Sequence, residues 1–374
     1  MTPTPPPPPD TSWLQALRQP QLSVSWELPE WERVIRLSRR LRLLGRLAES
    51  VIGAGLLDGV PIHAARHLRA ELRYSRWRSA ALVWLLERLP AMLGDTPYPL
   101  VLLKGAAYIG QDLPIALGRL PSDVDIMVPR AHLADAQARL VHAGWGEQEL
   151  DEHDRRYYRE WSHEVPPMRH PLHAVELDLH HNILPPVAHT NVDADLLLAR
   201  LQPSNWPRWQ VLHPTDQVLH CAVHLFHDSE ARDRLRDLVD LDGLLRSFGQ
   251  EIVFWDELIE RAGQLGLREP LALACHFTGS WLQTPIPPTV AYRIQSDGPG
   301  RWHSAWVRRA LTTVLTPTDP DHSPALRQGL AANVLLARYH YRRLPLRLLI
   351  PHLWHKMRKS QHSTAPEVAA TEQQ

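Results

Sequence analysis

Lysine and cysteine are both scarce in this chain, and each scarcity excludes something. Lys104, Lys356 and Lys359 are the only lysines among 374 residues, so arginine supplies nearly all the positive charge. Two cysteines are too few for a disulfide framework or for a cysteine-based zinc site. We interpret both as small core residues, because each lies in apolar sequence typical of a helix.

Net charge and long apolar runs are also missing. The 41 basic and 41 acidic residues cancel, which argues against a surface built mainly to bind nucleic acid. No apolar stretch reaches transmembrane length, and the proline-rich start lacks the charged and apolar parts of a signal peptide. The sequence therefore predicts a cytoplasmic protein with a sizeable packed core.

Hydropathy and proline spacing divide the chain into five regions. Residues 1–11 are rich in proline and predict a disordered leader. Apolar residues at steps of three and four predict an N-terminal helical region over 12–96. Short apolar strands around one clear helix predict an α+β unit over 97–186. A C-terminal helical domain over 187–359 and a disordered tail over 360–374 complete the expected organisation.

The α+β unit is expected to alternate short strands with little helix. A short helix is predicted near 106–109, and an amphipathic helix over 131–143 ends at Gly144. The predicted strands cover residues 100–103, 124–128, 145–150, 156–161 and 174–180.

Two aspartates separated by one residue stand out in the second of these strands. Side chains at i and i+2 share one face of a strand, so Asp123 and Asp125 point the same way. Two adjacent carboxylates are unfavourable unless a cation neutralises them. Mg²⁺ prefers carboxylate and phosphate oxygens, so the pair predicts a magnesium site.

The strand over 174–180 carries a second acidic face, formed by Glu176, Asp178 and His180. If it lies beside the first strand, a third acid reaches the same edge of the sheet. Three carboxylates can hold two Mg²⁺ ions roughly 3.5–4 Å apart, as in nucleotidyl transfer. The alternation alone leaves open whether Glu176 or Asp178 is the third ligand.

Lys104 and Gly105 end the first strand at a predicted turn. Glycine lets backbone N–H groups approach a phosphate closely, and a helix starting there would add its dipole. Lys104 and Arg119 could offset the charge of a triphosphate, Arg119 through two parallel hydrogen bonds.

These motifs together resemble the DNA polymerase β-like nucleotidyltransferase superfamily. More narrowly, they resemble the bacterial family of uncharacterised nucleotidyltransferases. The resemblance is carried by Leu103-Lys104-Gly105, by Arg119 with Ser122-Asp123-Val124-Asp125, and by Asp178-Leu179-His180. It covers roughly residues 30–270, and its specific motifs lie within 102–180. It implies a polymerase β-like core flanked by helical regions.

The resemblance also implies roles for the motif residues. Asp123 and Asp125 would bind the metals that hold a nucleoside triphosphate, and Asp178 would complete the second metal site and help deprotonate the acceptor hydroxyl. The nucleotide contacts would come from Lys104, Gly105, Ala106, Arg119 and Ser122. The implied cofactor is Mg²⁺, two ions per site, with Mn²⁺ as a substitute.

The implied reaction moves a nucleoside monophosphate from the triphosphate to a hydroxyl acceptor and releases pyrophosphate. The acceptor could be a small molecule, a glycan precursor, tRNA or a protein, and the neutral charge disfavours RNA. Many superfamily members have Gly-Ser or Gly-Gly at the turn where this chain has Gly105-Ala106, which removes a hydroxyl donor. That departure motivates an alternative, an inactive nucleotide-binding sensor or partner-binding module on the same fold.

Three further features have competing interpretations. His220, His224 and His227 share a helix face; we interpret the first and last as partly exposed and His224 as a wall of the site. Asp237, Asp240 and Asp242 favour a solvated helix side paired with Arg234 and Arg236. Residues 338–359 hold basic and apolar residues without acids, so they favour either weak peripheral membrane contact or packing on the helical domain.

Overall fold

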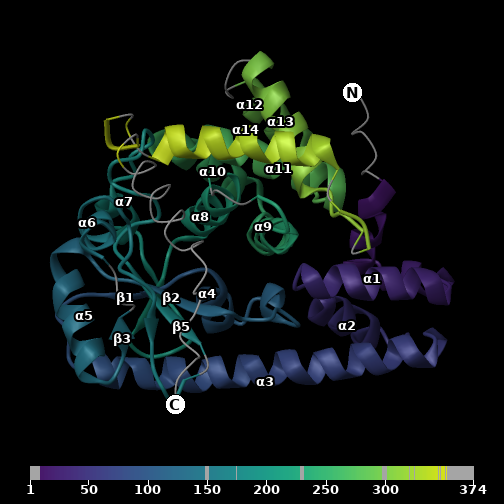
Figure 1. Ribbon diagram of the computed structural model, residues 1–374, viewed down its shortest axis with the longest axis horizontal. Helices are drawn as coiled ribbons and strands as arrows, with labels where there is room; N and C mark the ends of the chain where they lie inside the picture. The colour runs from purple at the N-terminus through teal and green to yellow at the C-terminus, as the bar shows by residue number, and fades with distance from the viewer. Residues whose placement is uncertain are drawn as a thin grey trace, which may run out of the picture.

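In the computed structural model of the protein, helical regions surround one mixed sheet (Figure 1). The structure describes residues 9–147, 151–173, 175–227, 231–296, 301–319, 321–323, 325–343, 345, 347–349 and 351. The predicted tail over 360–374 lies outside these residues, as do residues 1–8 of the predicted leader. The expected fold class, an α+β core flanked by helices, is confirmed.

The first described residues are folded, so the predicted leader is too long. Residues 9–11 belong to the 3₁₀ helix η1 (Pro9–Leu17), and Thr11 is fully buried. Trp13 and Leu14 follow it into the core, and their burial explains why η1 is ordered.

The N-terminal region that follows is helical throughout, as its periodicity predicts. Its longest element is α3, which runs along one edge of the molecule beneath α1, α2 and the sheet (Figure 1). α3 buries one side, including Leu68, Leu82 and Leu89. The elements are η2 (Pro20–Ser25), α1 (Leu28–Arg40), α2 (Leu44–Gly53), η3 (Leu57–Gly59) and α3 (Ile62–Leu93).

Seven strands form a single sheet in the described part of the chain, in the order β3-β4-β5-β2-β1-β7-β6. The two central strands β2 and β5 are parallel, whereas β1 runs antiparallel to β2 and parallel to β7. The strands are β1 (Leu100–Leu102), β2 (Asp123–Met127), β3 (Gly146–Glu147), β4 (Met168–Arg169), β5 (Glu176–His180), β6 (Gln202–Pro203) and β7 (Trp209–Val211).

The sheet extends beyond the predicted boundary of the α+β unit. β6 and β7 follow residue 186, and β7 pairs with β1 near the centre of the sheet. The unit predicted over 97–186 is therefore incomplete without the strand Trp209–Val211. This strand was missed because three residues are too short to show an alternating pattern.

Helices connect the strands of the sheet along the chain. The predicted strand over 156–161 is wrong, because these residues continue α6 after Asp151 accepts a capping hydrogen bond from the Asp154 N–H at 2.8 Å. The ion pair between Arg156 and Glu160, one helical turn apart, supports the helix further. The elements are α4 (Lys104–Gly110), η4 (Pro114–Ala116), η5 (Arg130–His132), α5 (Leu133–His142), α6 (Glu152–Glu160) and α7 (Ala194–Leu198).

A C-terminal group of helices completes the fold. α14 lies across the side of the molecule opposite α3, with α8, α9 and the sheet between them (Figure 1). The elements are α8 (Pro214–Phe226), α9 (Leu235–Phe248), α10 (Ile252–Gln264), α11 (Arg268–Leu282), α12 (Pro288–Ser296), α13 (Arg301–Leu315) and α14 (Leu326–Arg343). Among the described residues, none of the helices has the length and apolar character needed to cross a membrane.

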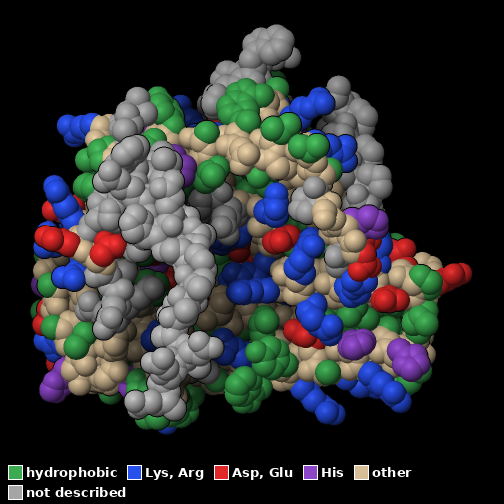
Figure 2. All heavy atoms as spheres, viewed as in Figure 1, with side chains coloured by type: hydrophobic (Ala, Val, Ile, Leu, Met, Phe, Trp, Pro, Cys, Tyr) green, Lys and Arg blue, Asp and Glu red, His purple; other side chains and the backbone are tan. Residues whose placement is uncertain are grey.

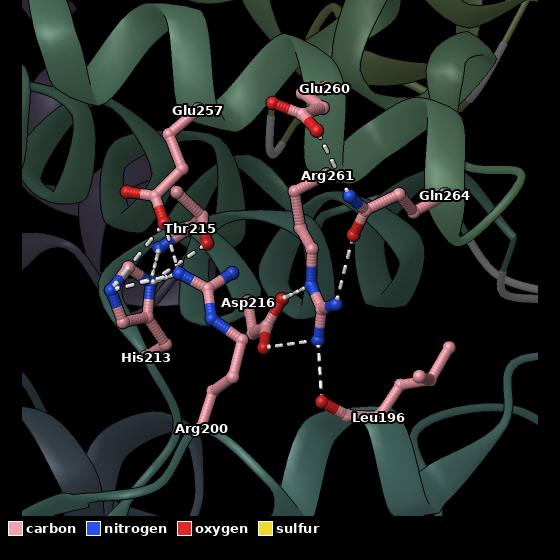
Figure 3. Close-up of polar contacts among 9 residues, drawn as sticks. All are labelled: Leu196, Arg200, His213, Thr215, Asp216, Glu257, Glu260, Arg261 and Gln264. Atoms are coloured by element: carbon pink, nitrogen blue, oxygen red, sulfur yellow. Dashed lines mark hydrogen bonds and ion pairs between the residues drawn. The ribbon is translucent and has the colours of Figure 1, made fainter.

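A buried ion pair fixes the start of α8 against α10 (Figure 3). Arg261 donates to both carboxylate oxygens of Asp216, at 2.6 and 2.9 Å, and to the Leu196 carbonyl of α7 at 2.7 Å. Beside it, Arg200 contacts both Glu257 and the ring of His213, the residue that precedes α8. These contacts fix the helix that carries His220 and His224 toward the sheet.

Candidate active site

Three aspartates come together where β2 and β5 lie side by side. In this parallel pair Asp125 is the register partner of Asp178, and Asp123 is the partner of Glu176. The apolar residues between them, Val124 and Leu177, are fully buried. The period-two pattern therefore directs apolar side chains to one face and acids to the other, as the sequence indicates.

Asp125 is buried and surrounded by positive groups. Its Oδ1 accepts hydrogen bonds from Lys104 Nζ at 2.7 Å and from His180 Nε2 at 3.0 Å. Burial opposes ionisation, but Lys104 and then His180 hold the pKa of Asp125 well below its usual range. The carboxylate is therefore ionised, and His180 must carry its Nε2 proton to donate.

Lys104 reaches Asp125 from a strained backbone position. Its φ of 44° lies in the left-handed region that lysine rarely adopts, at the junction between β1 and α4. Leu103 N–H donates to the Asp125 carbonyl at 3.0 Å, which fixes the junction beside β2. Asp125 and Asp123 raise the pKa of Lys104 although burial opposes its charge. Such strain, held by its surroundings, is typical of functional sites.

Asp178 is the least satisfied carboxylate of the group. Its Oδ1 is buried and has no hydrogen-bond partner among the residues that the structure describes. Burial and then the Asp125 charge raise the pKa of Asp178 to about 7. A buried oxygen atom without a donor costs free energy unless a proton or a cation satisfies it.

The donor set suits a divalent cation. Asp125, Asp178 and His180 each offer an atom within 4.8 Å of the others. His180 Nε2 is already turned to Asp125, so the open donors are the two carboxylates, the ligands that Mg²⁺ prefers. The unpartnered Asp178 oxygen is the observation that fits such an ion.

Asp123 begins β2 two residues before Asp125 and lies outside that tight group. Its Oδ1 accepts a hydrogen bond from Ser122 Oγ at 2.8 Å, and the side chain is partly exposed. Its charge nevertheless acts on both Asp178 and Lys104. Ser122, predicted to contact the nucleotide, therefore orients Asp123 in this structure.

Glu176 and Asp178, the two candidates for the third acid, have different surroundings. Glu176 is partly exposed, and its carboxylate binds Arg169 Nε at 2.6 Å. Asp178 is the register partner of Asp125, and its Oδ1 has no donor among the residues that the structure describes. These surroundings favour Asp178 over Glu176 as the third acid.

Arg119 and Gly105 have a structural relation that the sequence interpretation missed. Arg119 is 6% exposed and donates from Nε to Asp240 of α9 at 3.1 Å, so its charge is already neutralised inside the protein. Gly105 packs on this guanidinium, and a Cβ there would collide with it. Gly105 and Ala106 are themselves buried. Packing on Arg119 is therefore reason enough for a glycine at position 105, and Arg119 is bound to Asp240 rather than available to a phosphate.

A cavity of about 190 Å³ opens beside Lys104. Its wall includes His224, which the sequence predicts, and Arg342 and Arg343 at the end of α14. Lys and Arg side chains also gather below α14 in the view of Figure 2. A cavity with cationic walls next to carboxylates suits an anionic substrate.

His163 and Glu164 also line this cavity, and the sequence interpretation did not find them. They belong to an irregular segment that reaches the site because Glu164 forms an isolated β-bridge with His180. Burial lowers the pKa of His163 well below its usual range, so its ring is neutral. A bare His-Glu pair outside any periodic pattern offers no signal that could have singled it out.

Two further sequence interpretations are corrected here. His220 is 4% exposed rather than partly exposed, and burial lowers its pKa well below the usual range. Asp237, Asp240 and Asp242 are buried on α9 rather than solvated; each is paired with arginine, and Asp237 also with His224. His227 is partly exposed, as expected.

The described part of the basic 338–359 stretch is tied into the protein. Arg338 binds Glu269 at 2.8 Å and the Phe226 carbonyl at 3.1 Å, and Arg342 also pairs with Glu269. Although burial opposes ionisation, the two arginines lower the pKa of Glu269 to about 2. These contacts favour packing on the helical domain over membrane contact for this part of the stretch.

Comparison with known proteins agrees with this geometry. A family model described as an uncharacterised nucleotidyltransferase matches residues 27–283, which is more than half of the chain and includes all three aspartates. Neither the curated proteins nor the solved structures contain a match. The chain therefore belongs to this uncharacterised nucleotidyltransferase family, and nucleotidyl transfer is the general activity that its membership supports.

Proposed function

We propose that the protein transfers a nucleoside monophosphate from a nucleoside triphosphate to a hydroxyl acceptor and releases pyrophosphate, with Mg²⁺ as cofactor. The observation that carries the proposal is the pairing of Asp125 with Asp178 across β2 and β5, with a buried Asp178 oxygen that no donor in the described part of the chain satisfies. Family membership supports the reaction class, and the cavity beside Lys104 offers room for a substrate.

Asp123, Asp125 and Asp178 would hold the metal. When bound, Mg²⁺ neutralises the charge that develops on the phosphate oxygens during transfer. Mn²⁺, which takes similar ligands, should substitute.

Asp178 would also receive the proton of the acceptor. The acceptor oxygen forms a bond to the α-phosphorus, the bond from that phosphorus to the pyrophosphate oxygen breaks, and the hydroxyl proton passes to Asp178. Without a metal, burial and then the charge of Asp125 raise the pKa of Asp178 to about 7. A bound Mg²⁺ would favour the ionised form, so the carboxylate would be ready to accept a proton at neutral pH.

Lys104 would supply positive charge to the bound triphosphate. In the structure its ammonium group balances Asp125 at 2.7 Å. A metal at Asp125 would take over that neutralising role, which leaves the ammonium group for a triphosphate oxygen at the mouth of the cavity. Its side chain is the one lysine amine that lines this cavity among the described residues.

The test is a transfer assay with nucleoside triphosphates labelled at the α-phosphate, in cell extract with Mg²⁺. We expect label on one product class (small molecule, RNA or protein) with equal pyrophosphate release. Asp125→Asn should lower transfer on the order of 1,000-fold, because metal stabilisation of the transition state is worth several kcal/mol. Glu176→Gln is the matched control, since Glu176 occupies the same face of β5 but binds Arg169.

Undiminished transfer in Asp125→Asn would reject the proposal. Nucleotide binding in calorimetry without pyrophosphate release, across many acceptors, would favour the inactive sensor or partner-binding module instead. The buried Gly105-Ala106 turn, which lacks a hydroxyl donor, is the feature that keeps this alternative worth testing.

A further inference from the structure

A second set of metal-type donors lies on the other side of His180. His163, Glu164 and His180 each offer an atom within 4.8 Å of the others. The isolated bridge between Glu164 and His180 brings this segment against the end of β5. The set holds two imidazoles and one carboxylate, a donor combination unlike that of Asp125 and Asp178.

The two ring nitrogens of His180 face two different carboxylates. Nε2 lies 3.0 Å from Asp125 Oδ1, and Nδ1 lies 3.4 Å from Glu164 Oε2. Asp125 also holds the Lys104 ammonium group, so it is an ionised acceptor and Nε2 carries the proton. In a neutral ring Nδ1 is then a lone pair aimed at a carboxylate oxygen, and it makes no hydrogen bond among the described residues.

Burial makes this arrangement costly. The His180 side chain is 2% exposed, so water cannot insulate its lone pair from the Glu164 carboxylate. Two acceptors facing each other need a cation between them. Either a second proton on His180 or a metal ion would supply it.

His163 distinguishes the two possibilities. Its Nε2 lies 3.9 Å from the same Glu164 Oε2, and its ring centre is 5.5 Å from that of His180. Because His163 and Glu164 are consecutive in the chain, their nearness alone decides nothing. However, His163 Nδ1 is also buried without a hydrogen-bond partner among the described residues, and a proton shared by His180 and Glu164 would leave it unsatisfied. Ligands held roughly 2.0–2.2 Å from one tetrahedral ion lie about 3.3–3.6 Å apart, close to the separations seen here.

The cavity supplies a place for a further ligand. His163 and Glu164 both line it, together with His224 and His227. Three protein ligands with an open position toward a cavity are typical of catalytic or ligand-binding zinc sites rather than closed structural ones.

We propose that His163, Glu164 and His180 bind a first-row transition metal ion of the Zn²⁺ class, with an open coordination position toward the cavity. The site is distinct from the proposed Mg²⁺ site because imidazole nitrogens suit Zn²⁺, whereas Mg²⁺ requires oxygen ligands. Asp125 is not a ligand of this second site. It accepts the hydrogen bond from His180 Nε2 and so fixes the orientation and tautomer of the His180 ring. His180 thereby joins the two centres.

The experiment is calorimetric titration of Zn²⁺ into the full chain, stripped of metal by a chelator and kept in excess Mg²⁺. We expect one equivalent to bind, with affinity lowered at least about 100-fold in His163→Ala and in the near-isosteric Glu164→Gln. Asp125→Asn should weaken binding about 10- to 100-fold, as loss of an outer partner does. His63→Ala, which removes an exposed histidine on α3, is the matched control and should bind like the parent chain.

Co²⁺ provides a second readout that does not depend on activity. Its visible absorption should report a low-coordinate nitrogen and oxygen site in the parent chain and in His63→Ala, and should be lost in Glu164→Gln. Equal Zn²⁺ binding in the parent, His163→Ala and Glu164→Gln chains would overturn the proposal. So would the absence of Zn²⁺ binding in excess Mg²⁺. If Zn²⁺ also fails to bind without Mg²⁺, the cation is a proton on His180; if it binds only without Mg²⁺, the ion belongs to Asp125 and Asp178.

Discussion

Two acidic clusters in this protein share an Asp-x-Asp spacing and differ in almost everything else. Asp123 and Asp125 lie on strand β2, whereas Asp240 and Asp242 lie on helix α9. On the strand, both side chains share a face, and a third aspartate joins them from β5. On the helix, positions i and i+2 diverge, so each carboxylate meets different partners.

The difference lies in how well each cluster is neutralised. Asp240 pairs with Arg46 and Arg119, and Asp242 with Arg18, Arg246 and the Thr284 hydroxyl. The β2–β5 cluster has one lysine and one histidine on Asp125, and one oxygen of Asp178 has no donor among the residues described. Buried acids that are fully paired hold helices together, and an incompletely paired one marks the place where a ligand belongs.

The largest expected effect is at Asp178, where a substitution should abolish most of the activity without lowering thermal stability. Asp178→Asn should lower nucleotidyl transfer on the order of 1,000-fold, because it removes both a metal ligand and the proposed base. Its thermal unfolding midpoint at neutral pH should not fall, since the charge lost is one that burial disfavours. Transfer assays and thermal melts on the same preparation check both parts. Full activity with a lowered unfolding midpoint would instead give Asp178 the structural role that we assign to the aspartates of α9.

Asp240 should show the opposite behaviour. Asp240→Asn leaves Arg46 and Arg119 buried without a counter-charge, so we expect a loss of about 3–5 kcal/mol in the free energy of unfolding. Urea denaturation measures it. Asp233→Asn is the matched control, because its pair with Arg40 is more than a third exposed on both sides and should contribute at most about 1 kcal/mol. Equal urea midpoints for the two variants would contradict the assignment of Asp240 to the scaffold.

The pH dependence of stability gives a third, smaller test. The pKa of Asp178 is raised to about 7, so its neutral form stabilises the fold at low pH, and this stability is lost as pH rises through about 7. In chelator at pH 8, Asp178→Asn should therefore melt above the parent chain, and the gap should close as the pH falls toward 4. Mg²⁺ should raise the parent midpoint more at pH 8 than at pH 6, and should have little effect on the variant. A gap that widens as pH falls would show that the pKa shift has the other sign.

The sequence predicted the strand cluster because its signals are local. Asp123 and Asp125 lie at a spacing that β structure turns into a shared face, and Asp178 repeats the pattern on β5. The apolar periodicity of long helices such as α3 and α8 made them equally predictable from the sequence. The confirmed fold class rests on these patterns.

The remaining features depend on contacts between residues far apart in the chain. Arg119 and Asp240 are 121 positions apart, so no local pattern shows that their charges cancel inside the protein. The aspartates of α9 look like a solvated face until the arginines of other elements are placed against them. Tyr157 and Tyr158 favour a strand by propensity, and the Asp151 cap with the Arg156–Glu160 pair overrides them.

The smallest expected effect concerns Asp242, where partners are redundant. Arg246→Met removes one guanidinium, but Arg18 at 2.8 Å and Thr284 at 2.7 Å still neutralise the fully buried carboxylate. We expect a loss of about 1 kcal/mol, the contribution of ordinary hydrogen bonds, measured by urea denaturation. Combining Arg18→Met with Arg246→Met should cost about 0.5–3 kcal/mol more than the sum of the single changes, because the last cation then leaves a buried charge. Strictly additive losses would mean that Asp242 does not need its arginines, and that full neutralisation is not what distinguishes the α9 cluster from the strand cluster.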